Sequence, residues 1–304
     1  MGDAAPAAIA PTTVLPWSHA LLALAVVAVW GTNFVVIRVG LDHLPPLLFC
    51  TLRFTFALIP AAFFLKRPRV PWLHLAAYGM LIGAGQFGLL FLAMNGHIAP
   101  GLASLVMQMQ VFFTIGASVW LAKEHVRLFQ LAALVLAAAG LGVIALHTDA
   151  QTTPLGLGLT LLASLSWAGG NMVMKASGKV DALAYVVWAS LFAIPPLIAM
   201  TLIFEGWPAI EHGLRAAGPL TWAAVIWQSV GNTMFGFAAW GWLLARHPAA
   251  VVTPAALLVP VFGMGASALL LHEPLPGWKL LAALLVLAGL AVIVLYPRLR
   301  PAKA

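Results

Sequence analysis

The sequence carries tryptophan and amide side chains at spacings that place them together on one face of an α-helix. Trp30 and Asn33 are three residues apart, and Ser164, Trp167 and Asn171 follow one another at positions i, i+3 and i+7. Residues at these spacings are neighbours on a helix surface. Aromatic walls with a few amide groups suit a ligand that has an apolar ring and a small polar head. These residues therefore indicate a binding site.

Other apolar stretches add polar side chains that extend this candidate site. Gln228, Asn232 and Phe235 share a helical face, whereas Gln108 and Gln110 lie about 200° apart and cannot both face one cavity. The predicted substrate-binding residues are Trp30, Asn33, Tyr78, Gln86, Gln108, Ser164, Trp167, Asn171, Gln228, Asn232, Phe235 and Trp240. The competing interpretation is that amide and hydroxyl groups hold neighbouring helices together and that the aromatic rings are core.

Two glycines lie close to one part of this candidate site. Tyr78 and Gln86 lie two helical turns apart, with Gly79 and Gly83 between them. Because glycine has no side chain, we expect the pair to open space beside the two polar residues.

Three charged residues are notable for their positions. One lies inside an apolar run, where a charge is costly, and two stand at expected helix ends. Arg53 is inside an apolar run that has no carboxylate at similar depth, so it either meets carbonyl groups at helix ends or has a role in binding or gating. Glu124 and Glu273 stand at equivalent turns of the chain. We expect each to cap the helix that follows it, and an ion-pair gate is the alternative.

The residue inventory argues against a metal site, a cofactor site and an enzyme. Cys50 is the single cysteine, which excludes internal disulfides, C-x-x-C redox pairs and thiolate metal clusters. The acidic residues lie in tails, loops or helix ends, and no histidine lies near the middle of an apolar run. No catalytic or nucleotide-binding motif is present. We therefore expect neither a proton relay at membrane depth nor a carboxylate that selects cationic drugs.

The composition indicates that these residues are positioned by membrane-spanning helices. Of the 304 residues 63% are hydrophobic and 8% are charged, far from the balance of soluble proteins. A span needs about 20 apolar residues, and lipid excludes exposed irregular backbone. Ten such runs are found, at residues 17–39, 44–65, 71–94, 99–121, 126–146, 154–176, 182–204, 218–243, 250–271 and 277–297. The sequence thus predicts an all-α integral membrane protein with ten transmembrane helices.

The net charge of +7 is interpreted as a topology signal, because the bases form no nucleic-acid-binding face. One set of alternate loops holds Lys66, Arg67, Arg69, Lys123, Arg127, Lys175, Lys179, Arg246, Arg298, Arg300 and Lys303. The other set holds Arg38, Arg215 and Lys279. The bias predicts that both termini are cytoplasmic in a multi-pass protein of a bacterial-type inner membrane.

The chain repeats itself. Residues 124–146 align without gaps on residues 273–295 with ten identities, including A-G-L-x-V-I. Trp30 and Arg38 match Trp167 and Lys175 at the same spacing. A repeat of five spans leaves the next unit starting from the opposite side, so the two halves are expected to be inverted. The predicted parts are a flexible cytoplasmic tail (1–16), the first repeat (17–147), a connecting loop (148–153), the second repeat (154–297) and a basic cytoplasmic tail (298–304).

These motifs also resemble a known family. The chain resembles the EamA-type branch of the drug/metabolite transporter superfamily in three motifs. These are W-G-T-N-F-x-x-I-R from Trp30, L-R-F from Leu52, and E-x(15)-G-L-x-V-I at the end of each half. Within that branch the chain most resembles the YddG-type aromatic amino acid exporters. The resemblance implies a ten-helix inner-membrane exporter and covers about residues 17–297.

Residues and resemblance together predict a transporter that is not an enzyme. We expect it to export amino acids, aromatic or neutral and zwitterionic, or related small metabolites by alternating access, without a buried-carboxylate proton relay. Its expected partners are the small-molecule substrate and the lipid bilayer, with no nucleic acid, in a monomer or weak homodimer. The alternatives are a multidrug exporter of the same superfamily and, further off, a channel or structural membrane protein.

Overall fold

The computed structural model describes residues 15–122, 127–148 and 151–299, and within them the chain is helical without β-strands. Glu124, one of the predicted charged residues, lies outside the described residues. Eight helices among the described residues are long and apolar enough to cross a membrane, and the apolar helix Pro46–Ala62 is shorter. The prediction of an all-α integral membrane protein is therefore confirmed.

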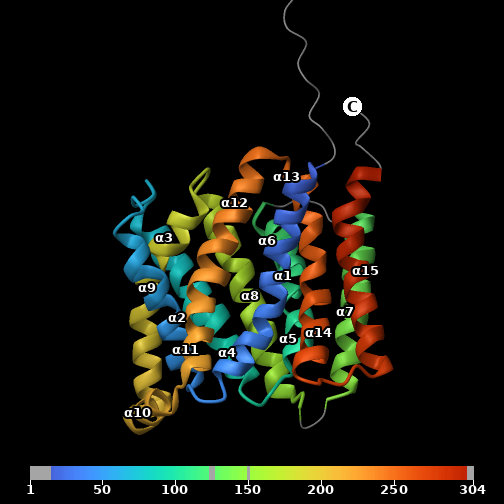
Figure 1. Cartoon of the computed structure of the whole chain (residues 1–304). Coiled ribbons are helices and arrows are strands. Elements are labelled where there is room, and N and C mark those ends of the chain that lie inside the picture. The colour runs from blue at the N-terminus through green and yellow to red at the C-terminus, as the bar shows by residue number, and fades with distance from the viewer. Residues whose placement is uncertain (1–14, 123–126, 149–150, 300–304) are drawn as a thin grey trace, which may run out of the picture.

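Helical segments occupy each of the apolar runs that the sequence predicts (Figure 1). Their bounds are α1 (Trp17–Gly40), α2 (Pro46–Ala62), α3 (Trp72–Gly79), η1 (Met80–Gly88), α4 (Leu89–Met94), α5 (Pro100–Val106), α6 (Met109–Ala122), α7 (Leu128–Leu146), α8 (Pro154–Ala176), α9 (Ala182–Met200), η2 (Thr201–Glu205), α10 (Gly206–Ala216), α11 (Pro219–Ile226), η3 (Trp227–Phe235), α12 (Gly236–Arg246), α13 (Ala249–Val252), η4 (Thr253–Leu258), α14 (Val259–Leu270) and α15 (Gly277–Leu299).

Local sequence signals begin several of these helices. Pro46, Pro154 and Pro219 occupy the first turns of α2, α8 and α11, where proline loses no helical hydrogen bond. The side chain of Asp181 accepts a hydrogen bond from the backbone nitrogen of Ala184 at 2.8 Å and caps α9. The connections between successive helices are short.

Two long helical segments are interrupted by π-helices at the same place. Segment 72–94 is built from α3, η1 and α4, and segment 219–246 is built from α11, η3 and α12. In each, an α-helix of 8 residues precedes a π-helix of 9 residues. Figure 1 shows α3 and α12 at one end of the molecule and α4 and α11 at the other, so the two segments run in opposite directions. π-Helical turns are rare and often mark functional sites.

The helices pair in a reciprocal pattern. α1 packs along α14 and α8 packs along α6, so the first helix of each predicted half contacts the fourth helical segment of the other. α2 packs along α9, and α7 packs along α15 at one side of the molecule (Figure 1). Each of these four pairings joins the two predicted halves.

Two glycines allow α3 and η1 to pack closely against α9. A Cβ atom at Gly79 would lie 2.2 Å from the carbonyl oxygen of Ala189 in α9, and one at Gly83 would lie 2.3 Å from the Cβ atom of Ala193. Small residues four apart on both helices are typical of tight packing within membranes. The prediction that Gly79 and Gly83 open space beside Tyr78 is only partly correct, because α9 fills most of that space and leaves a cavity of about 10 Å³ lined by Tyr78, Gly79 and Gly83.

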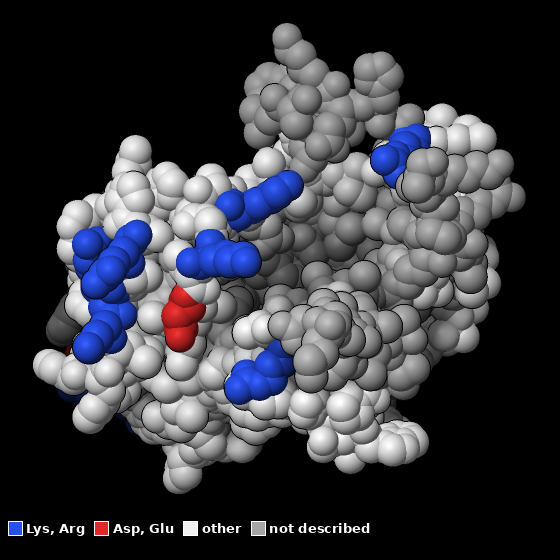
Figure 2. Space-filling model, turned by 90° about the horizontal axis from the view of Figure 1, so that it is seen from above, with Lys and Arg blue, Asp and Glu red and all other residues white. Residues whose placement is uncertain are grey.

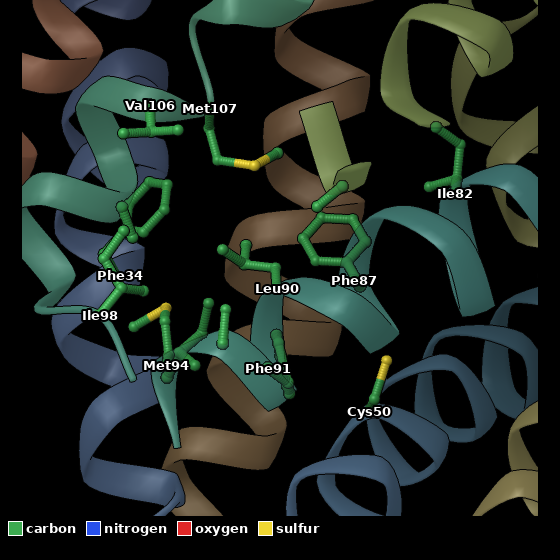
Figure 3. Packing of buried hydrophobic residues seen from close by; sticks show 14 of the residues in the cluster. Phe34, Cys50, Ile82, Phe87, Leu90, Phe91, Met94, Ile98, Val106 and Met107 are labelled. Carbon is green, nitrogen blue, oxygen red and sulfur yellow. The ribbon is translucent and has the colours of Figure 1, made fainter. Parts of the chain in front are cut away.

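The apolar core lies mainly among the segments of the first predicted half. Figure 3 shows Phe34 of α1, Cys50 of α2, Phe87 of η1 and Met107, which lies between α5 and α6, converging from different elements. The thiol of Cys50 is free and buried. These side chains hold α1, α2 and the π-helix η1 in fixed relation to one another.

The two ends of the molecule differ in charge. Lys and Arg side chains gather on the end that carries the start of α3 and the end of α12, around a central depression (Figure 2). At the opposite end the described bases are paired with acids: Arg38 with Asp42, Arg215 with Glu211, and Lys279 with Glu273. The charge difference between the ends is therefore larger than the count of basic residues alone suggests.

Candidate functional site

Trp30 lies at the junction of α1 with η3 and α12. Its indole nitrogen donates a hydrogen bond to the backbone oxygen of Asn232 at 3.3 Å. Its ring centroid lies 5.2 Å from that of Trp240 and 5.9 Å from that of Phe237. A Cβ atom at Gly236 would lie 2.4 Å from the Trp30 nitrogen, so a glycine is required there. Three of the predicted site residues, Trp30, Asn232 and Trp240, are thus brought together from both halves of the chain.

Arg53 of α2 lies between the two predicted halves and contacts Thr233 of η3, the residue that follows Asn232 in the chain. Its side chain is 1% exposed, and its guanidinium carbon lies 3.5 Å from the centroid of the Phe87 ring in η1. Its Nη2 atom donates to the hydroxyl of Thr233 in η3 at 3.3 Å, and that hydroxyl donates to the backbone oxygen of Gln228. The hydroxyl of Ser229 donates to the backbone oxygen of Arg53 at 2.9 Å. Side chains of η3 and η1, not backbone carbonyls at a helix end, therefore surround this guanidinium.

The predicted face of Gln228, Asn232 and Phe235 is only partly correct. Gln228 is 0% exposed and Asn232 is 5% exposed, whereas Phe235 is 39% exposed. The prediction assumed α-helical geometry, but all three residues lie in the π-helix η3. A π-helix has hydrogen bonds from i to i+5 and more residues per turn, so a residue seven positions on is rotated away from the face.

Two glutamines of the fourth segment contact the second half. The side-chain amide of Asn171 in α8 donates to the side-chain oxygen of Gln110 at 2.9 Å. The Gln108 amide donates to the backbone oxygen of Ala256 in η4 at 3.5 Å. Gln108 and Gln110 therefore point to different elements, in agreement with the prediction that they do not share one cavity.

The other candidates are dispersed. Tyr78 is buried with its ring centroid 5.1 Å from that of Tyr185, and the Ser164 hydroxyl donates to the backbone oxygen of Leu161 in its own helix. Gln86 is buried in η1. Trp167 is half-buried against the main core, and no ring contact joins it to Trp30 among the described residues. The hydrogen bond of Ser164 within its own helix favours a packing role over substrate binding for this residue.

Asn33 lies one helical turn beyond Trp30 on α1. The residue is buried, and its side-chain oxygen has no hydrogen-bond partner among the described residues. A buried amide oxygen without a partner is costly. The position therefore keeps an acceptor available beside the aromatic group around Trp30.

Glu273 does not cap the helix that follows it. Its carboxylate accepts a hydrogen bond from the backbone nitrogen of Gly101 in α5 at 2.9 Å and pairs with the amine of Lys279 at 3.0 Å. Both side chains of the ion pair are buried. The capping prediction for Glu273 is therefore wrong about the helix, because tertiary packing brings the backbone nitrogen of Gly101 at the start of α5 to the carboxylate, and α15 contacts it through the Lys279 amine. The contact fastens the first half to the second.

Comparison with known proteins identifies the family. A model described as the EamA-like transporter family matches residues 17–146 and again residues 154–295. The chain belongs to the EamA-like transporter family. This family match confirms that the protein is a membrane transporter and not an enzyme.

Individual relatives of this EamA-like transporter cover nearly its whole length. A protein of Salmonella typhimurium named a probable amino-acid metabolite efflux pump is 41% identical over 92% of this chain and 95% of its own. A protein of Escherichia coli with the same name is 40% identical over 93% of this chain and 96% of its own. A solved crystal structure matches with a TM-score of 0.62 and 20% identity, over 94% of this chain and 99% of that one, which supports the fold.

Sequence reasoning about this EamA-like transporter did not include five side chains that take part in the contacts described above: Phe87, Gln110, Ser229, Thr233 and Phe237. Thr233 stands five residues after Gln228, a spacing that has meaning only in a π-helix. Gln110 was set aside because an unbroken α-helix was assumed, whereas α5 and α6 are separated by a turn. Phe237 is on the same helix as Trp240, three residues away, which is a usable signal.

Glu205 in this EamA-like transporter caps a helix of the other half. Its two carboxylate oxygens accept hydrogen bonds from the backbone nitrogens of Leu47 and Leu48 at 2.6 and 3.0 Å, at the start of α2. Replacing Glu205 with alanine is expected to lower the free energy of unfolding by about 1–2 kcal/mol, the usual effect of losing a helix cap. Thermal unfolding of detergent-solubilised variants measures this. Glu205→Gln keeps one acceptor, so its unfolding midpoint should lie between those of the wild type and of Glu205→Ala. An unchanged midpoint for both variants would contradict the capping role.

Proposed function

We propose that this transporter exports an amino acid or a related small zwitterionic metabolite, with preference for aromatic or other neutral side chains. The observation that carries the substrate class is the similarity, over nearly the whole chain, to proteins named amino-acid metabolite efflux pumps. The aromatic preference is supported by the rings of Trp30, Trp240 and Phe237, which stand beside buried amides of η3. An indole or phenyl ring stacks on such a wall.

The proposed transport unit has ten spans in two inverted halves of five, residues 17–147 and 154–297. The twofold match of the family model supports the duplication. The opposite directions of the two π-interrupted segments and the reciprocal pairing of α1 with α14 and of α8 with α6 support the inversion. Inverted repeats place the substrate near the bilayer midplane between the halves and exchange their conformations during transport.

The orientation follows from charge. The end where Lys and Arg side chains gather in Figure 2 is proposed to face the cytoplasm of a bacterial-type cell, with both termini on that side of the inner membrane. The bases at the other end are neutralised by acids. In this orientation the central depression in Figure 2 opens toward the cytoplasm, and the contacts of Glu205 and Glu273 lie at the opposite end.

Counterflow in proteoliposomes tests the proposal. Vesicles preloaded with unlabelled amino acids should accumulate labelled tryptophan transiently, with saturation, which a channel does not give. Trp30→Ala is expected to slow this exchange about tenfold because the ring wall is lost, by analogy with a stacking contribution of about 1.4 kcal/mol. Trp17→Ala is the matched control, since Trp17 is highly exposed at the start of α1. Competition by a quaternary ammonium dye but by no amino acid would instead indicate a multidrug exporter.

A further inference from the structure

Arg53 has donors that the folded chain does not use. The side chain is almost completely buried, and its single side-chain hydrogen bond, to Thr233, is long at 3.3 Å. Within the described part of the chain, the Nε and Nη1 atoms are buried without a hydrogen-bond partner. None of the ion pairs among the described residues involves Arg53. The contacts that the structure describes for its positive charge are the Thr233 hydroxyl, the face of the Phe87 ring at 3.5 Å and the more distant Phe54 ring.

Gln228 shows the same lack of partners next to Arg53. It is fully buried, and neither its side-chain nitrogen nor its side-chain oxygen has a hydrogen-bond partner in residues 15–122, 127–148 and 151–299. Its backbone oxygen accepts the Thr233 hydroxyl, and that hydroxyl accepts the hydrogen bond from Arg53, which ties the two residues into one group. A buried guanidinium with two unused donor atoms and a buried amide with none of its hydrogen bonds made are costly unless something pairs with them.

This polar group lies between the two halves of the chain. Arg53 comes from α2 and Phe87 from η1, whereas Gln228 and Thr233 come from η3. The two π-helices that interrupt segments 72–94 and 219–246, η1 and η3, therefore both contribute to it. A position between the halves is where an inverted-repeat transporter binds its substrate, and the aromatic wall around Trp30 adjoins the same π-helix through Asn232.

We propose that Arg53 binds the carboxylate of the transported molecule, with the Gln228 amide as a second polar contact. A guanidinium forms strong charge-assisted hydrogen bonds with a carboxylate, and burial makes the pair stronger than it is in water. One cation suits one monovalent anion. The substrate class is thus a small carboxylic acid that carries an apolar ring or chain, with Trp30 and its neighbours facing the ring. This inference rests on the proposed export of amino acids and names the group that the site recognises.

The test compares a substrate with analogues that lack the carboxylate. In counterflow of labelled tryptophan, unlabelled tryptophan should compete at least tenfold better than tryptophanamide or tryptamine. Arg53→Gln should weaken tryptophan at least tenfold and remove its advantage over the two analogues, and Arg53→Lys should retain part of it. Arg38→Gln is the matched control, because Arg38 is half-exposed and paired with Asp42. If Arg53→Gln lowers transport but keeps the preference for the acid, Arg53 is structural and the proposal is overturned.

A second measurement uses the wild-type protein, so it gives a result even if the Arg53 variants do not fold. It also separates the Arg53 site from the proposed export of amino acids. Purified wild-type protein should gain thermal stability with indole carboxylates and much less with their amides, and chloride at the same concentration should not reproduce the gain. If no amino acid is transported but the carboxylates still stabilise selectively, the proposed function fails and the Arg53 site stands. Equal stabilisation by acids and amides, or stabilisation by any simple anion, would overturn the Arg53 site.

Discussion

Replacing Glu273 with alanine is expected to destabilise the protein by about 3–5 kcal/mol, the usual result of leaving one partner of a buried ion pair alone. Lys279 is buried and would lose its 3.0 Å partner, and the backbone nitrogen of Gly101 would lose its acceptor. Because the contact joins α5 to the loop before α15, the loss should separate the two halves at this end. Thermal unfolding in detergent and limited proteolysis measure the effect.

Two controls separate the buried charge from general sensitivity. Glu211→Ala breaks an exposed ion pair with Arg215 and should cost less than about 1 kcal/mol. The double substitution Glu273→Ala with Lys279→Met removes both charges and should recover much of the stability that Glu273→Ala loses. A Glu273→Ala protein as stable as Glu211→Ala would show that the pair does not fasten the halves.

Gly79→Ala is expected to destabilise the protein by roughly 1–3 kcal/mol through overpacking, although alanine is the better helix former. The added methyl group would lie 2.2 Å from the carbonyl oxygen of Ala189, and a backbone atom cannot rotate away as a side chain can. α3 and α9 would have to separate. Denaturation midpoints of the purified protein report the change.

Gly142→Ala is the matched control for Gly79→Ala. Gly142 lies inside α7, and a Cβ atom there meets nothing within 4 Å. This variant should gain up to about 1 kcal/mol from helix propensity alone. If the two variants shifted stability in the same direction, close packing of α3 on α9 would not be the reason for the glycine.

Much of the fold can be predicted from the sequence, and the candidate site only in part. The apolar runs predict the long helical segments because backbone groups in lipid must be satisfied within the segment itself, but they do not predict α10 (Gly206–Ala216), which lies between two runs. Of the predicted binding residues, Trp30, Asn232 and Trp240 come together, and Asn171 contacts Gln110, which is not among the predicted residues. Trp167 and Ser164 do not join the group around Trp30.

Local periodicity in the sequence determined the apolar spans, and motif resemblance, borne out by the family match, determined membership in the duplicated transporter family. Only the tertiary structure decided what depends on neighbours from distant segments. The π-helix η3 turns Phe235 outward, α9 closes on Gly79, and the carboxylate of Glu273 reaches α5. Helix periodicity specifies which side chains share a face of one helix. The helix that meets that face is chosen by packing, and packing also left Nε and Nη1 of Arg53 and the side-chain amide of Gln228 buried without hydrogen-bond partners among the described residues.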